Sequence, residues 1–102
     1  APKARRAVKE TGGTITSVSD VEITEAQSQL ATKEGIGVEP ASATSIAGTR
    51  KLVDEGVISP DETVVCVATG HLLKDPDAAV EASGRPTNVE ADEDAVKDAL
   101  RC

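Results

Sequence analysis

Residues 64–68 read Val-Val-Cys-Val-Ala, and this apolar run constrains the fold of the chain more than any other feature. A half-exposed strand alternates apolar and polar side chains, whereas this run does not alternate. Such a run is typical of a strand buried on both faces, as in a parallel sheet that helices cover. We therefore expect a strand at residues 64–68. Residues 14–18, which are rich in β-branched side chains, predict a second strand.

Helices are expected between and after these strands, over residues 20–34, 40–55, 76–82 and 92–101. Ser19 and Glu22 have the spacing of a capping box at the start of the first helix. Gly35 is a stop signal at its end. Pro40 suits the first position of the second helix, because its missing N–H would have no partner there in any case.

Several features indicate that the chain is a piece of a larger domain. Basic residues up to Lys9 precede two glycines, as in the last turns of a helix, so we expect the chain to begin inside one. The 22 Val, Ile and Leu residues, with no Phe, Tyr, Trp or Met, predict a thin core. Two strands are too few for a sheet that is covered on both faces. The fold class is therefore predicted to be α/β, a fragment of a three-layer fold with a mostly parallel sheet flanked by helices.

Charge and cysteine content exclude several classes of function. The formal net charge is -7, so we expect no binding to nucleic acid or to an anionic membrane, whose phosphates the chain would repel. No stretch is long and apolar enough to span a membrane. Cys66 and Cys102 are too far apart to indicate a disulfide framework or a zinc site, and we expect no metal site around the single histidine, His71. A reducing cytoplasm is the expected compartment.

Thr69 and Gly70 directly follow the apolar run, where open α/β sheets bind their ligands. The Thr69 hydroxyl can donate or accept a hydrogen bond, and glycine allows the backbone to approach a ligand closely. Thr69 could instead simply close the strand end by bonding to nearby backbone. His71 is either a general base or an exposed loop histidine. Glu39 could orient a cofactor, or stabilise the start of the following helix, or do both.

Five segments together resemble the threonine synthase family of pyridoxal-phosphate (PLP) enzymes, which belongs to the tryptophan-synthase-β-like group: residues 18–20, 35–36, 39–43, 64–71 and 74–76. The resemblance implies a fold type II PLP enzyme that converts O-phosphohomoserine and water to L-threonine and phosphate. It makes residues 1–102 the C-terminal portion of the enzyme, with residues 80–102 as a loosely attached tail helix. Its implied partners are the remainder of the same enzyme chain and the small-molecule substrate, in an enzyme that could be an oligomer.

The resemblance also assigns a cofactor wall to this chain. It places the Thr69 hydroxyl opposite the pyridine nitrogen of PLP, and the turn from Glu39 to Ser42 alongside the ring with Gly70. No catalytic residue is expected here, because the family's Schiff-base lysine lies upstream in a Ser-x-Lys-Asp motif. None of the chain's lysines has that setting: Lys3, Lys9, Lys33, Lys51, Lys74 and Lys97. Leu72 departs from the family pattern, which has glycine there, so the loop after His71 could be arranged differently.

Two other interpretations stay open at this point. One is a fragment of a threonine dehydratase-like PLP lyase. The other is a free-standing, non-catalytic domain that binds a partner. A self-contained domain should bury residues 64–67 completely within its 102 residues. The enzyme-fragment interpretation instead predicts that the isolated chain is inactive.

Overall fold

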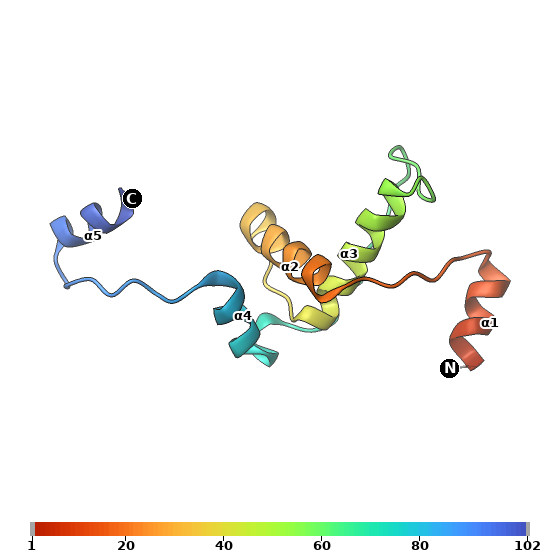
Figure 1. Cartoon of the computed structure of the whole chain (residues 1–102), viewed down its shortest axis with the longest axis horizontal. Helices are drawn as coiled ribbons and strands as arrows, with labels where there is room; N and C mark the ends of the chain where they lie inside the picture. The colour runs from red at the N-terminus through yellow and green to blue at the C-terminus, as the bar shows by residue number, and fades with distance from the viewer. Residues whose placement is uncertain (1, 102) are drawn as a thin grey trace.

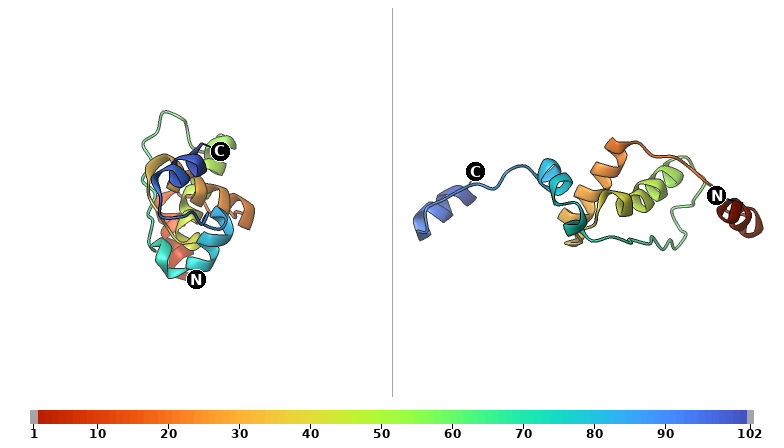
Figure 2. Two further views of the ribbon diagram at one scale, coloured as in Figure 1. Left: turned by 90° about the vertical axis from the view of Figure 1, so that its left-hand side faces the viewer. Right: turned by 90° about the horizontal axis from the view of Figure 1, so that it is seen from below.

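The computed structural model describes residues 2–101. Its regular elements are α-helices and one short 3-10 turn, joined by segments without regular structure. The elements are α1 (Pro2–Thr11), α2 (Asp20–Glu34), α3 (Pro40–Asp54), η1 (Leu72–Lys74), α4 (Pro76–Ser83) and α5 (Glu93–Leu100). Helices α2 and α3 pack together at the centre, and α1 and α5 lie at opposite ends (Figure 1). The molecule measures 60 × 29 × 19 Å, with a radius of gyration of 18.1 Å (Figure 2). A compact domain of this length would have a radius of about 13 Å, so the chain is extended.

The predicted helices are confirmed, because local signals decide where they begin and end. The Ser19 side chain accepts from the Glu22 amide at 3.3 Å, and the Glu22 carboxylate accepts from the Ser19 amide at 2.6 Å, so the capping box at α2 is complete. Gly35 ends α2 with a φ of 68°, a conformation that favours glycine. Pro40 occupies the first turn of α3. Helices α4 and α5 lie within a residue of their predicted bounds.

The core is small and lies between α2 and α3. Its buried apolar side chains are Ala26, Val38, Ala43 and Ala47, with Val18, Ile23, Leu30 and Ile46 packed against them. Three of the four buried members are alanine, which lets the helices approach closely but removes little apolar surface from water. The buried Gln27 side chain adds a hydrogen bond between α2 and the residues before α3, since its Nε2 donates to the Val38 carbonyl at 2.7 Å.

The predicted α/β class, with its mostly parallel sheet flanked by helices, is wrong for this chain. Residues 2–101 contain no strand, and their single β pairing is an isolated antiparallel bridge between Val38 and His71. Residues 14–18 and 64–69 are extended but unpaired. β-branched side chains favour an extended backbone, but a strand also needs a neighbouring strand to bond its amides and carbonyls, and residues 2–101 supply none beside these two segments. Val65 and Val67 are consequently 85% and 68% exposed.

The two ends of the chain lie away from the core. Extended residues 84–92 separate α5 from α4, so that α5 stands apart from α2 and α3 (Figure 1). The apolar side chains of Val96 and Leu100 on α5 are exposed. Cys102, like residue 1, lies outside the described residues. Within residues 2–101, no helix combines the length and the apolar character that crossing a membrane requires.

Candidate functional site

Thr69 and Gly70 meet the first turn of α3, which brings together residues 27 and 28 positions apart. The Ser42 Oγ lies 3.1 Å from the Thr69 Oγ1, and it accepts a hydrogen bond from the Gly70 amide at 2.5 Å. The Glu39 amide in turn donates to the Gly70 carbonyl at 3.0 Å. Ser42 and Gly70 are buried, whereas Thr69 is exposed. The structure therefore gathers the four predicted site residues into one cluster: Glu39, Ser42, Thr69 and Gly70.

The Glu39 side chain covers Gly70 and is held there by an ion pair. A Cβ atom built on Gly70 would overlap the Glu39 carboxylate, so a larger residue at position 70 would displace the Glu39 side chain. The Lys74 Nζ lies 3.1 Å from the Glu39 Oε1, and the Glu39 side chain is only 17% exposed. Glu39 precedes α3, but its side chain makes no capping hydrogen bond, so the ion pair with Lys74 rather than helix capping fixes its position. Lys74 was not predicted as a site residue, since nothing in the sequence links two positions 35 apart.

The hydroxyls of this cluster can present a proton to a group outside the chain. Ser42 accepts the Gly70 N–H, which leaves the Ser42 hydroxyl proton free to be donated to the Thr69 oxygen. In that arrangement the Thr69 hydroxyl keeps its own proton for an acceptor beyond the site. Because Thr69 is exposed while Ser42 is 2% exposed, Thr69 is the outward end of this short chain of hydrogen bonds.

The loop after Gly70 is arranged by His71 and Leu72. The exposed His71 accepts from the Leu73 amide at its Nδ1, at 3.1 Å, and caps the η1 turn. This contact fits the loop-histidine interpretation. The Leu72 side chain packs against Gly37, whose missing Cβ leaves the space that Leu72 occupies. Leu72 also lines a cavity of about 340 Å³ between α2 and α4, with Gln27, Ser28, Ala31, Thr32, Gly37, Val38, Ala79, Ala82 and Ser83.

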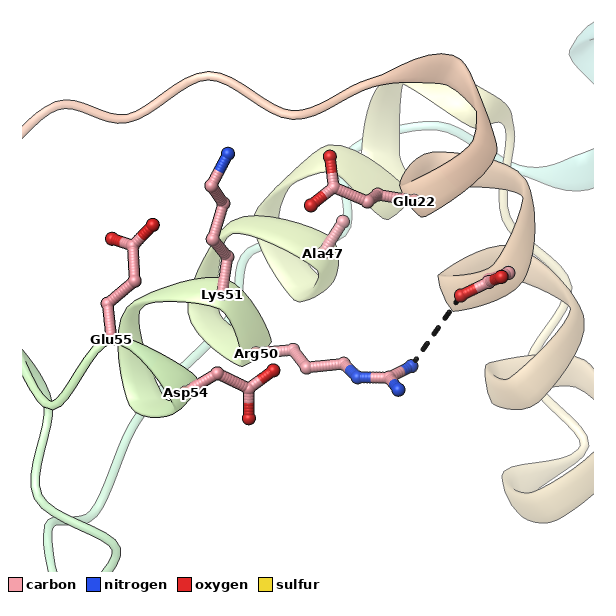
Figure 3. Close-up of a pocket in the computed structure, with 7 residues that line it drawn as sticks. Glu22, Ala47, Arg50, Lys51, Asp54 and Glu55 are labelled. Atoms are coloured by element: carbon pink, nitrogen blue, oxygen red, sulfur yellow. Dashed lines mark ion pairs between the residues drawn. The ribbon is translucent and has the colours of Figure 1, made fainter.

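A second cavity, of about 320 Å³, lies between the first half of α2 and the last half of α3 (Figure 3). Four of its charged side chains engage one another or nearby backbone. Arg50 is 4.0 Å from Glu25, and the Lys51 Nζ donates to the Ser17 carbonyl at 2.7 Å. Glu22 is already held by the capping box, whose Ser19 backbone N–H and then hydroxyl lower the pKa of the Glu22 carboxyl. Within the described part of the chain, no group of three or more His, Cys, Asp or Glu side chains could hold a metal ion.

Comparison with known proteins decides the family. The model of the pyridoxal-phosphate dependent enzymes matches residues 1–70, which include all four residues of the cluster but not Lys74. The chain belongs to this family. Among curated relatives, threonine synthase of Methanosarcina acetivorans is 59% identical over 98% of this chain, and that of Methanocaldococcus jannaschii 55% identical over 99%. Threonine synthase of Mycobacterium tuberculosis is 42% identical over 95% of the chain.

The predicted resemblance to threonine synthase is thereby confirmed. The chain spans about a quarter of the length of these relatives, 25% of the two archaeal proteins and 27% of the mycobacterial one. The family's cofactor is PLP, and the cluster is suited to one edge of that molecule. The exposed Thr69 hydroxyl can donate to a ring nitrogen, and the buried Ser42 and Gly70 behind it hold it in place.

Proposed function

We propose that this chain forms one wall of the PLP pocket of a threonine synthase, which converts O-phosphohomoserine and water to L-threonine and phosphate. The observation that carries the proposal is the Thr69–Ser42–Gly70 chain of hydrogen bonds, which ends in an exposed hydroxyl. The similarity to threonine synthases over nearly the whole chain supports the choice of reaction. It also favours this enzyme over a threonine dehydratase-like lyase.

In this proposal Thr69 is the hydroxyl that binds the pyridine nitrogen. PLP, when bound, supplies an electron sink for the substrate's reacting carbon atoms. A neutral hydroxyl leaves the ring nitrogen largely unprotonated, whereas a carboxylate there would favour its protonation. Ser42 orients Thr69 and does not itself need to reach the ring, since it is 2% exposed.

The second role in the proposal belongs to the ion pair between Glu39 and Lys74. The Glu39 carboxylate covers Gly70, and in this proposal it would lie beside the bound ring. An unpaired carboxylate close to the ring nitrogen would raise the affinity of that nitrogen for a proton. Lys74, at 3.1 Å, offsets this negative charge and so keeps the surroundings of the nitrogen close to neutral. The pair is partly exposed, because the Lys74 side chain is on the solvent side, so its effect is moderate.

We further propose that the remainder of the same polypeptide is the partner of this chain. Ile15, Val65 and Val67 are mostly exposed, and covering such side chains contributes about 1.5–3 kcal/mol each when burial is complete. This exposure also argues against a free-standing domain, which should bury residues 64–67. The rest of the enzyme would supply the lysine and the groups that bind the cofactor and substrate phosphates. Residues 80–102 would be its C-terminal tail, and a biosynthetic enzyme of this kind would act in the cytoplasm.

The reaction can be tested with the complete polypeptide that contains this chain. Purified with PLP, it should release phosphate from O-phosphohomoserine and form threonine in equal amounts. Release of phosphate is measured by a colorimetric assay and threonine by chromatography. Consumption of threonine without any phosphate release would instead support the dehydratase-like lyase. Lack of both activities in a PLP-bound protein would contradict the enzyme proposal.

A further inference from the structure

Three hydroxyl side chains run in a stripe along α3 and contact the extended segment before the site. Ser42, Ser45 and Thr49 are spaced i, i+3 and i+7, which places them on one face of the helix. The Ser42 Oγ contacts the Thr69 Oγ1 at 3.1 Å, and the Ser45 Oγ donates to the Val67 carbonyl at 3.1 Å. The Thr49 Oγ1 lies 3.2 Å from the Cys66 Sγ. Each hydroxyl therefore holds a different point of residues 66–70.

The order of these contacts defines a register. As α3 proceeds from Ser42 to Thr49, its contacts move backward along the segment, so the two run antiparallel. Seven residues of helix cover about 10 Å. Four extended residues cover about 13 Å, so the two lengths roughly agree. A slip of one residue would move the segment by about 3.3 Å, which is too far for hydroxyl contacts of this length to persist.

Little else in the described residues fixes this register. Between residues 2 and 101, no backbone–backbone hydrogen bond joins residues 64–69 to another element, and such bonds begin only at Gly70. Cys66 and Thr69, three residues apart, both contact α3, whereas a regular strand would direct them to opposite faces. The path of the segment thus follows the helix hydroxyls and not a sheet ladder.

We propose that Ser45 and Thr49 are positioning residues that set the register of residues 66–70 along α3 and thereby hold the Thr69 hydroxyl in place for the cofactor. Neither residue needs to touch the cofactor, because both act through the segment that carries Thr69. The functional part of this inference rests on the proposed role of Thr69, whereas the register itself does not. The experiments below separate the two.

The register is tested by a disulfide in the complete polypeptide. In Thr49→Cys, the new thiol would replace a hydroxyl that lies 3.2 Å from the Cys66 Sγ, so mild oxidation should join positions 49 and 66. The matched control is Thr44→Cys, since Thr44 is exposed on α3 and bonds its own helix at the Pro40 carbonyl. Peptide mapping identifies the bridge, in a Cys102→Ser background. Absence of the 49–66 bridge, or an equal yield of a 44–66 bridge, would overturn the register.

The positioning role is tested by a double-mutant cycle on PLP affinity. Ser45→Ala combined with Thr49→Val should weaken PLP binding about fivefold, a change comparable to the loss of one hydrogen bond. In a Thr69→Val background the same two substitutions should change the PLP affinity less than about twofold, because the hydroxyl that Ser45 and Thr49 position is gone. A purely structural role would weaken binding equally in both backgrounds, and that result would overturn the proposal. Ser45→Thr, which keeps a hydroxyl, should restore most of the affinity lost in Ser45→Ala.

The two proposals fail in different ways. If the 49–66 disulfide forms but Thr69→Val leaves PLP affinity unchanged, the proposed role of Thr69 is wrong and the positioning role falls with it, although the register stands. If Thr69→Val weakens PLP binding but no 49–66 disulfide forms, Thr69 keeps its role and this inference is wrong.

Discussion

The Ser42 side-chain oxygen accepts a 2.5 Å hydrogen bond from the buried Gly70 amide and lies 3.1 Å from the Thr69 hydroxyl. One side chain in the first turn of α3 thus organises a backbone amide and a hydroxyl that lie almost thirty positions later. Ala43 and Ala47 anchor α3 to α2, so the position of Ser42 is fixed by the core. Ser42 in turn fixes the positions of Thr69 and Gly70.

Replacing Thr69 should test the site directly. Thr69→Val keeps the shape and removes the hydroxyl, so the complete enzyme should bind PLP roughly five- to tenfold more weakly, equivalent to about 1 kcal/mol. Fluorescence titration of the apoenzyme measures this. The control is Thr63→Val, an exposed position in the same segment, which should bind PLP normally. Equal affinities for the two variants would contradict a contact between Thr69 and the cofactor.

A carboxylate at the same position should have a different effect. Thr69→Asp should favour a protonated pyridine nitrogen and so redirect the reaction more than it weakens binding. The absorbance spectrum of the bound cofactor and the ratio of products report this change. The proposal loses support if Thr69→Asp behaves like Thr69→Val in both measurements.

Removing the Ser42 hydroxyl should destabilise the protein. Ser42→Ala leaves the buried Gly70 N–H without its acceptor, at a cost of about 1–3 kcal/mol. Thermal unfolding of the complete enzyme should therefore begin at a lower temperature. Thr44→Ala removes a hydroxyl from the exposed face of the same helix and should stay within about 0.5 kcal/mol of the parent. Similar midpoints for the two variants would show that the Gly70 amide finds another acceptor.

Gly70→Ala and Gly48→Ala should have opposite effects on stability. At Gly70 the new methyl group would overlap the Glu39 carboxylate and disturb its ion pair with Lys74, so we expect a loss of about 1–3 kcal/mol. At Gly48, inside α3, the nearest atom is the Thr16 Cγ2 at an ordinary 3.8 Å, and alanine should gain up to about 1 kcal/mol. Adding Glu39→Ala should recover part of the loss in Gly70→Ala. Strict additivity of these two changes would argue against the overlap.

The capping box predicts a pH dependence for α2. Ser19 holds the pKa of Glu22 below its ordinary value, so the ionised carboxylate stabilises the folded helix. This stabilisation is complete above the unfolded-state pKa of Glu22 and is lost as the pH falls through the lower, folded-state pKa. Ser19→Ala should cost about 1 kcal/mol and move the pKa of Glu22 part of the way back. An NMR titration of the Glu22 carboxyl measures the shift, and an unchanged pKa in Ser19→Ala would contradict it.

The isolated chain should not bind PLP covalently. None of its lysines lies in the family's Ser-x-Lys-Asp motif, and Lys74 is engaged with Glu39 while Lys51 is engaged with the Ser17 carbonyl. Borohydride reduction followed by mass spectrometry should find no lysine modified in a saturable, stoichiometric way, and no phosphate should be released from O-phosphohomoserine. Specific attachment that disappears when one lysine is changed would contradict this prediction.

Much of the candidate site depended on the resemblance and not on the residues alone. The sequence pattern shows that Thr69 and Gly70 follow the end of an apolar run, but it does not link them to Ser42. The position of Glu39 is explained equally well by the dipole of the following helix. The partner of Glu39 could not be predicted, because Lys74 reaches it only through the η1 turn, after Gly70 and Leu72 have bonded to Glu39 and Gly37. The hydroxyl stripe could have been found from the i, i+3, i+7 spacing of Ser42, Ser45 and Thr49, which α3 shows in sequence.

Local sequence signals are enough to place the helices. The capping box of Ser19 and Glu22, the proline at position 40 and the glycine stop at position 35 act over three or four residues, so no distant contact is needed to place a helix end. The conformation of residues 64–68, in contrast, depends on long-range contacts. An apolar, β-branched segment favours an extended backbone, but whether it becomes a strand depends on a neighbour that supplies hydrogen bonds and cover. Here the α3 hydroxyls bind one side of that segment, and its valines remain exposed.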